Sequence, residues 1–475
     1  MKPVVTVSEM RAIDAEAHHT VAESVLVERA GTAVAVAALR LMGGAYGRRV
    51  VVVAGKGNNG ADGKVAAGRL ARRGARVEVV EADAAPERIG PGRDVDLVVD
   101  AAYGTGFRGE YKAPSVPGGV RVLAVDIPSG VDGDTGEAHG EPLRADVTVT
   151  FAALKPGLLQ GDGPLLAGRV EVADIGLDVS RARTMVMEDA DVAALLPPRQ
   201  RAAHKWQSAV AVVAGSPGMT GAAGLCAMGA YRAGAGMVRL GVPGADPDEL
   251  PVPEAVSTAL PATGWSADAL RMADRCKALV IGPGLGRSTS TAREVRRLVE
   301  TFPGTVVVDA DGLYALGTGD EAAEVLAGTE GSVVLTPHEG EFSHLTGSRP
   351  GVDHIGAALD AAAALDAVVL LKGPTTIVAE PGGSVRLAVK GTPRLATAGT
   401  GDVLSGVIGA FAARGLDPLT AAALGAHVHG AAAALGRPVG LVAGDLPDLV
   451  ALWLSGPPGA SPPPAAPALS GPPRG

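Results

Sequence analysis

The segment ATAGTGDVLSG (396–406) places glycines and a carboxylate directly before an apolar, helix-like run. Gly399 and Gly401 flank Thr400, and Asp402 follows. Glycines at a helix entrance let backbone N–H groups converge on an anion, and the helix dipole adds to the attraction. A carboxylate there can take a proton from a hydroxyl while the amides hold an arriving phosphoryl group. We expect the helix terminus to keep Asp402 ionised; the alternative is a simple N-cap.

Other apolar runs of this half also end in polar turns. They are ALVIGPGLG (278–286), VVVDADGL (306–313), LTPHEGEF (335–342) and LLKGPTTIV (370–378). Ligands collect at the carboxyl ends of strands in α/β sheets, which favours a binding role for His338 and Lys372 over a structural one. Asp309 and Asp311 either position a substrate or cap a turn. Glu339 and Glu341 are interpreted as helix caps first and as Mg²⁺ ligands second.

The first half carries a glycine-rich loop, GKGNNGADG (55–63), between an apolar run and a helix-like stretch. This loop matches neither the dinucleotide fingerprint nor the Walker A pattern, so alone it predicts an anion-binding or a structural turn. Two further runs end in VVDAAYGTGFRGE (98–110) and VDIPSGVDGDTGE (125–137), and LKPG follows at 154–157.

These motifs need strands and helices to position them. Val-rich runs alternate with Ala-rich stretches from residue 50 and again from residue 209, which predicts βαβ units and parallel sheets in two α/β domains. The Pro-bearing, basic segment 195–207 marks the boundary, so we expect domains at 1–198 and 199–454. The Pro/Gly/Ala-rich end, 455–475, is predicted to be disordered.

Composition narrows the class of protein. The 475 residues are 47% hydrophobic but only 3% aromatic, and the net charge is −9. An acidic chain poor in aromatic residues is a poor partner for nucleic acid or anionic membrane. Two cysteines, Cys226 and Cys276, cannot build a disulfide framework. With no apolar signal core or spanning segment, the sequence predicts a cytoplasmic protein, and we expect a homo-oligomer.

In order and spacing, the motifs of the second half resemble the ribokinase-like dehydratase of the NAD(P)H-hydrate repair system. That family phosphorylates the C6 hydroxyl of the hydrated nicotinamide ring with ADP, and loss of phosphate gives NADH or NADPH, AMP and phosphate. The resemblance implies a ribokinase-like three-layer sandwich, Mg²⁺ with ADP, and Asp402 as general base. It implies nucleotide contacts from Lys372, Gly373, Pro374, Thr375, Thr376, Gly399 and Gly401. It implies hydrate contacts from Ala222, Gly284, His338 and Asp402.

The motifs of the first half resemble the NAD(P)H-hydrate epimerase domain, a Rossmann-like three-layer sandwich. The resemblance implies a K⁺ ion held by Asn59, Asp100 and Ser129. It implies contacts to hydrated NADH or NADPH from Asn58, Asn59, Gly60, Ala61, Asp62, Gly104, Thr105, Gly106, Phe107, Arg108, Gly109, Glu110 and Asp126. The reaction inverts a carbon that bears a hydroxyl and a ring nitrogen, so a carboxyl group that protonates the hydroxyl suffices. Asp126 is the candidate, with a turn-capping role as the alternative.

Two departures from these families are visible. The family loop reads NNGGDG, whereas this chain has Ala61 at the fourth position; if that position needs a positive φ, alanine costs on the order of 1 kcal/mol. The opening HKG of the dehydratase is HKWQSA here, so Trp206 implies a different entrance loop.

Two other functions compete with bifunctional repair. The second half suits a kinase for a small alcohol, such as a vitamin precursor or sugar, because a fold alone does not select a substrate. Alternatively, the first half is a cofactor-binding module without activity, a reading that only Ala61 invites.

Overall fold

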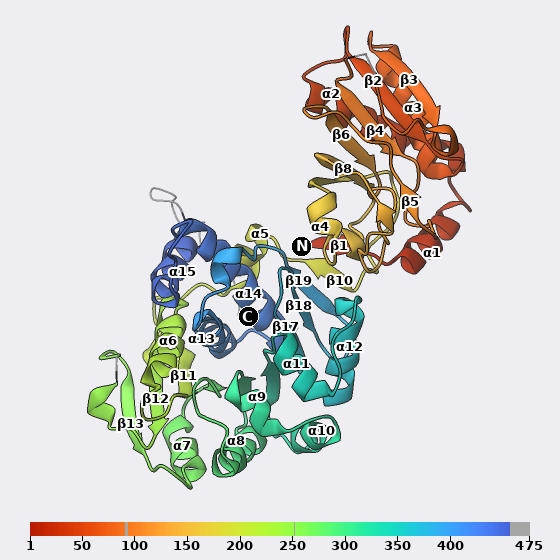
Figure 1. Ribbon diagram of the computed structural model, residues 1–475. Helices are drawn as coiled ribbons and strands as arrows, with labels where there is room; N and C mark the ends of the chain where they lie inside the picture. Colours follow the sequence, from red (N-terminus) through yellow and green to blue (C-terminus); the bar gives the residue numbers. More distant parts are fainter. Residues whose placement is uncertain (91–93, 251, 457–475) are drawn as a thin grey trace, which may run out of the picture.

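The computed structural model describes residues 1–90, 94–250 and 252–456. Each half of the chain folds around its own main sheet (Figure 1). The tail expected to be disordered spans 455–475, and its residues 457–475 lie outside the described residues. No helix in the described ranges is long and apolar enough to cross a membrane.

The sheet of the first half has six strands in the order β3-β2-β4-β6-β8-β9, and every neighbouring pair is parallel. The central strands are continuous Val, Leu and Ala runs, as expected where both faces are buried. Their bounds are β2 (Arg49–Ala54), β3 (Arg76–Glu81), β4 (Leu97–Ala101), β6 (Arg121–Val125), β8 (Val147–Phe151) and β9 (Arg169–Ala173).

Two helices, α2 (Glu23–Met42) and α3 (Asn58–Ala71), cover one face of this sheet with small apolar side chains. Loops and short elements cover the other face: β5 (Tyr111–Lys112) pairs with β7 (Gly140–Glu141). The remaining elements are α1 (Val7–Ala17), η2 (Pro156–Leu158) and α4 (Gly163–Leu166). The carboxyl edge therefore stays open between α1, α2 and the start of α3.

The sheet of the second half has eleven strands in the order β1-β10-β19-β18-β17-β16-β15-β14-β11-β12-β13, and the run from β17 to the edge strand β13 is parallel. β17, β18 and β19 are antiparallel. The bounds are β11 (Ala209–Val213), β12 (Met237–Pro243), β13 (Val256–Leu260), β14 (Ala278–Ile281), β15 (Thr305–Val308), β16 (Ser332–Leu335), β17 (Val368–Leu371), β18 (Thr376–Ala379) and β19 (Val385–Ala388).

Helices cover both faces of the second sheet, which gives the expected three layers (Figure 1). One face carries α6 (Thr220–Arg232), α13 (Thr400–Ala413), α14 (Pro418–Leu435) and α15 (Leu446–Leu454). The other carries α7 (Ser266–Ala273), α8 (Thr289–Thr301), α9 (Asp311–Leu316), α10 (Asp320–Ala327), α11 (Glu339–Thr346) and α12 (His354–Leu365).

Two short strands of the first half extend the second sheet. β10 (Thr184–Val186) runs parallel to β19, and β1 (Lys2–Val4) pairs antiparallel with β10. The linking helix α5 (Asp189–Leu195) also packs against the second half, through Val192. By sheet membership the second half therefore begins before the expected boundary at 198, and it includes the N-terminal strand.

Candidate functional site

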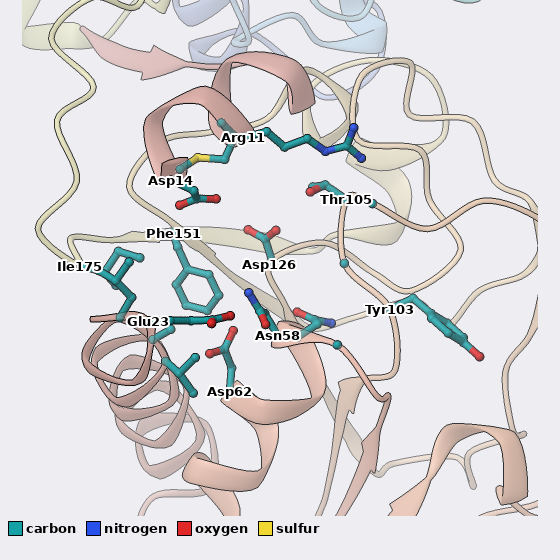
Figure 2. A pocket seen from close by; sticks show the side chains of 18 of the residues that line it. Arg11, Asp14, Glu23, Asn58, Asp62, Tyr103, Thr105, Asp126, Phe151 and Ile175 are labelled. Atoms are coloured by element: carbon teal, nitrogen blue, oxygen red, sulfur yellow. The ribbon is translucent and has the colours of Figure 1, made fainter. Parts of the chain in front are cut away.

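A cavity of about 780 Å³ lies at the carboxyl edge of the first sheet; we call it the first-half cavity (Figure 2). It is bordered by the loops after β2, β4 and β6 and by α1, α2 and α3. Most residues that the family resemblance assigns to the hydrate line it: Asn58, Asn59, Asp62, Gly104, Thr105, Gly106, Phe107, Arg108 and Asp126.

The remaining assigned residues, Gly60, Ala61, Gly109 and Glu110, are not among the residues that line the cavity. Gly60 faces the backbone, because a side chain there would overlap the Gly55 carbonyl. Ala61 lies within α3, and its N–H donates to the Gly57 carbonyl at 3.1 Å. Its φ is not positive, so the strain considered from the sequence does not arise.

The three residues expected to hold K⁺ come from three strand ends. Ser129 donates from Oγ and from its backbone N–H to the Asp100 carboxylate, at 2.6 and 2.9 Å. Asp100 is 1% exposed, and burial raises its pKa against these hydrogen bonds. The Asn59 side-chain amide is buried, and neither its oxygen nor its nitrogen has a hydrogen-bond partner. A buried carboxylate, a hydroxyl and an unpartnered amide oxygen suit a hard cation.

Asp126 follows β6 with a φ of 65°, in the left-handed region that aspartate tolerates better than most residues. Its Oδ1 accepts from the Lys155 ammonium at 2.7 Å and from the Thr150 hydroxyl at 3.0 Å. Lys155 is 1% exposed and also donates to the carbonyls of Phe151 and Ala153. A buried ion pair of this kind is strongly orienting, because each charge needs the other.

Three further carboxyl groups, those of Asp14, Glu23 and Asp62, border the first-half cavity (Figure 2). Burial raises the pKa of Asp62 to about 8, and the charge of Asp126 adds to the shift. Burial also raises the pKa of Asp14, but Lys155 and His18 oppose that shift. Perturbed carboxyl groups gathered in a cavity are a signature of acid–base chemistry.

In the second half, Asp402 lies in the first turn of α13 and is half-buried. Gly399 is the N-cap, with a φ of 90° that favours glycine. Burial and the nearby Asp309 raise the pKa of Asp402 to about 7, although Lys372 opposes the shift. The expectation that the helix terminus keeps Asp402 ionised stays a prediction, and burial and the neighbouring acids act against it.

Lys372 at the end of β17 lies beside this helix entrance. Its ammonium is 2.6 Å from Asp309 Oδ1, and the Ser405 hydroxyl of α13 donates to the other oxygen of Asp309 at 2.7 Å. Glu341 is 4.0 Å from the same ammonium. A side chain at Gly401 would approach the ammonium, so the glycine leaves room beside it. The arrangement gathers one cation and several acids around the Gly399–Gly401 amides.

Ala222 and Gly284 lie together, since a Cβ at Gly284 would be 3.0 Å from that of Ala222. His338 is the N-cap of α11: its Nδ1 accepts from the backbone N–H groups of Gly340 and Glu341, at 3.0 and 3.2 Å. Its ring is nevertheless 58% exposed, so the second nitrogen can meet a ligand. The Glu341 carboxylate accepts from the His338 N–H at 2.9 Å and so completes the cap.

The expected nucleotide segment LLKGPTT forms the turn between β17 and β18. Gly373 and Pro374 are exposed there, and Thr376 begins β18. Thr375 instead reaches the first half, where its hydroxyl donates to the Leu159 carbonyl at 2.6 Å. This part of the structure links the two halves directly.

Several capping and orienting roles are settled by contacts. Asp311 accepts from the Gly286 N–H and from Arg287, so it holds the turn after β14. Trp206 sits in the 3₁₀ turn η3 (Lys205–Ser208) beneath the Arg275 guanidinium, 4.1 Å from the ring centre. The segment that replaces the family HKG therefore forms a compact turn.

Known proteins match both halves. A family model described as NAD(P)H-hydrate dehydratase matches residues 210–449, and one described as YjeF-related protein N-terminus matches 23–88 and 81–157. A protein of Moorella thermoacetica named bifunctional NAD(P)H-hydrate repair enzyme Nnr is 39% identical, over 90% of this chain and 91% of its own. The chain belongs to the family of bifunctional NAD(P)H-hydrate repair enzymes.

Further relatives of the repair enzyme agree. The protein of the same name from Mycobacterium tuberculosis is 38% identical, over 89% of this chain and 92% of its own. A ribokinase-like superfamily protein from Enterococcus faecalis shares the fold of the second half, with a TM-score of 0.51 and 19% identity, over 57% of this chain and 95% of that one.

Lys155 and Asp14 are among the residues of the repair enzyme's first-half cavity that sequence reasoning missed. Lys155 stands in the LKPG motif that supported the resemblance, which was its only signal. Nothing in the sequence indicates that this lysine is buried against Asp126, or that α1 brings Asp14 to the cavity.

Proposed function

We propose that the first half interconverts the R and S forms of hydrated NADH and NADPH. In this proposal the second half dehydrates the S form with ADP and releases NADH or NADPH, AMP and phosphate. The observation that carries it is Asp402 in the first turn of α13, with a pKa near neutrality beside the Gly399 and Gly401 amides.

The proposed dehydration begins at Asp402. A base with a pKa near the working pH can take the proton of the C6 hydroxyl and still be half ionised. The hydroxyl oxygen attacks the terminal phosphorus of ADP, and the N–H groups at the start of α13 hold the developing charge. The ring nitrogen then expels phosphate from C6, and loss of a ring proton restores the double bond.

Lys372 supports this step as a cation next to the phosphates. Its ion pair with Asp309 fixes the ammonium beside Gly401. A Mg²⁺ ion bound with the nucleotide would supply positive charge that offsets the charge of the phosphates.

In the first half we propose that Asn59, Asp100 and Ser129 hold K⁺. The unpartnered Asn59 amide oxygen and the buried Asp100 carboxylate support this assignment. When bound, the ion would supply a positive charge beside Asn59, which lines the cavity. The residues of the cavity that face it bind and orient the hydrated ring.

The test of the dehydratase half supplies the S hydrate and ADP. We expect the reduced-nicotinamide absorbance to return with the wild type and not with Asp402→Asn, while both variants bind ADP in a titration. A stable phosphorylated product without NADH would instead support the small-alcohol kinase. ATP replaces ADP in a parallel reaction to define the phosphate donor.

We also propose self-association of the chain. The second half exposes apolar side chains near the end of α14 and in α15, namely Leu435, Val439, Val442 and Leu452. Light scattering of the full chain measures the mass of the particle. A cytoplasmic location stays a prediction, supported by two free, buried cysteines.

A further inference from the structure

We propose that two carboxyl groups share the proton transfers of the epimerase, with Asp62 as the acid and Asp126, held by Lys155, as the base. This inference rests on the proposed function of the first half. It differs from the expectation that Asp126 alone protonates the departing hydroxyl.

The contacts of Asp126 make it a proton acceptor. The Lys155 ammonium and the Thr150 hydroxyl both donate to its Oδ1. Because Lys155 is buried, this ion pair holds the Asp126 carboxylate in one orientation at the cavity. The second oxygen, Oδ2, remains for a water molecule in the cavity. Lys155 is thus a positioning residue, because it acts through Asp126.

Asp62 has the opposite surroundings. It is 6% exposed on α3, borders the same cavity, and has no cationic partner within ion-pair distance among the described residues. Both influences on its pKa raise it: burial first, and then the charge of Asp126. A carboxyl group kept protonated at neutral pH can donate to a leaving group.

Asp14 and the other charged residues of the cavity fit this role less well. Lys155 and His18 lower the pKa of Asp14 against its burial, so it is less strongly held in the protonated form. The charged and titratable residues that line the cavity around Asp62 and Asp126 are Arg11, Asp14 and His18 of α1, Glu23 of α2, and Tyr103, Arg108 and Lys155 of the loops.

The proposed step needs no reactant other than the hydrate and water. Asp62 gives its proton to the C6 hydroxyl, the C–O bond breaks with its electron pair on oxygen, and water leaves as the ring nitrogen forms a double bond to C6. A water on the other face then attacks C6 and gives a proton to Asp126. The electron pair returns to nitrogen, and C6 is inverted. The two carboxyl groups reset by proton exchange with solvent.

The test compares Asp62→Asn with Asp14→Asn in the full chain. Epimerisation is measured by chromatographic separation of the hydrates, from pure R hydrate and without nucleotide. We expect a loss of about 100-fold or more for Asp62→Asn and a smaller loss for Asp14→Asn. Dehydration of S hydrate with ADP, measured on the same preparations, should equal that of the wild type in both variants.

The outcomes separate two kinds of failure. If the wild type does not interconvert the hydrates, the proposed function of the first half is wrong. If the wild type interconverts the hydrates and the epimerisation rate of Asp62→Asn stays within about threefold of the wild-type rate, Asp62 is not the acid. The same holds if Asp14→Asn loses more of the epimerisation rate than Asp62→Asn does.

A pH profile adds a readout that a structural role would not move. The wild-type rate from R to S should fall as the pH rises through about 8, where Asp62 loses its proton. Asp62→Glu should recover part of the rate and keep a falling limb, whereas the residual rate of Asp62→Asn should lack it. A falling limb that persists in Asp62→Asn belongs to another group and overturns the assignment. In Lys155→Met, kcat should fall by a larger factor than KM rises.

Discussion

At the scale of single residues, burial decides the chemistry of the acids more than sequence position does. Asp402 and Asp62 both lie near helix starts, where the dipole favours the charged form. Yet burial raises both pKa values, to about 7 and about 8. Motif resemblance predicts Asp402 as the base, but its pKa depends on Asp309 and Lys372, which only the fold brings close.

The pH dependence of dehydration follows from Asp402. A general base acts in its ionised form, so the rate at saturating S hydrate and ADP should rise about tenfold per pH unit below about 7 and level off above it. Stopped-flow absorbance measures the profile from pH 5.5 to 9, a range of about two pH units on either side of that pKa. A rate that is flat across this range would remove Asp402 from the role of base.

The stability of the first half should respond to Asp62 in a defined direction. Its folded pKa of about 8 lies above the ordinary 3.8, so the folded state binds the extra proton between these values. The contribution of this carboxyl to the free energy of unfolding therefore falls as the pH rises through that window. Above about pH 8 the folded protein bears the full cost of burying the ionised carboxylate.

Replacing Asp62 by asparagine removes this cost. The Tm of Asp62→Asn relative to the wild type should rise with pH and be highest near pH 9, by several degrees for a cost of a few kcal/mol. Calorimetry at three pH values measures it, and Asp14→Asn should show a smaller rise because Lys155 and His18 oppose the pKa shift of Asp14. A Tm difference that shrinks as the pH rises would show that Asp62 is charged in the folded protein.

At the scale of elements, most strands were predictable because continuous apolar runs end in Gly-rich turns. The run at 367–380 was harder: it forms the two strands β17 and β18 with a turn at the Lys372 motif, where the apolar pattern shows one run. The helix expected after the GKGNNGADG loop begins inside it, at Asn58, because the loop asparagines are already helical.

The helical position of Ala61 makes a prediction about the departure from the family loop. Ala61→Gly should leave epimerisation within about twofold and lower the free energy of unfolding by up to about 1 kcal/mol, because glycine weakens helices. Gly60→Ala is the contrast, since its methyl group would overlap the Gly55 carbonyl and should cost both activity and stability. Urea titration and the R-hydrate assay measure the two effects. Faster epimerisation in Ala61→Gly would show that the methyl group does obstruct the ligand.

At the scale of the whole molecule, two α/β halves could be predicted, but their connection could not. β1 and β10 contribute only KPV and TMV to the second sheet, too little for an apolar pattern to reveal. The halves also meet where the Thr375 hydroxyl donates to the Leu159 carbonyl and where Gln160 Oε1 accepts from the Ile355 N–H. Such contacts depend on tertiary proximity across about 200 residues of chain.

Thr375→Val tests this connection. Valine keeps the shape but loses the donor, so we expect the free energy of unfolding to fall by about 1 kcal/mol. The KM for ADP should change little if the hydroxyl holds the first half. Denaturant unfolding and steady-state kinetics report the two quantities. A tenfold rise in KM with unchanged stability would return the hydroxyl to the nucleotide.

The central claim is that one chain joins both repair steps, and pure R hydrate tests it most directly. With ADP, the wild type should turn R hydrate into NADH with one AMP and one phosphate per NADH, followed by absorbance and product analysis. Asp402→Asn should yield only a mixture of R and S hydrates. Consumption of ADP with a lasting phosphorylated product, or NADH formation that survives Asp402→Asn, would contradict the account.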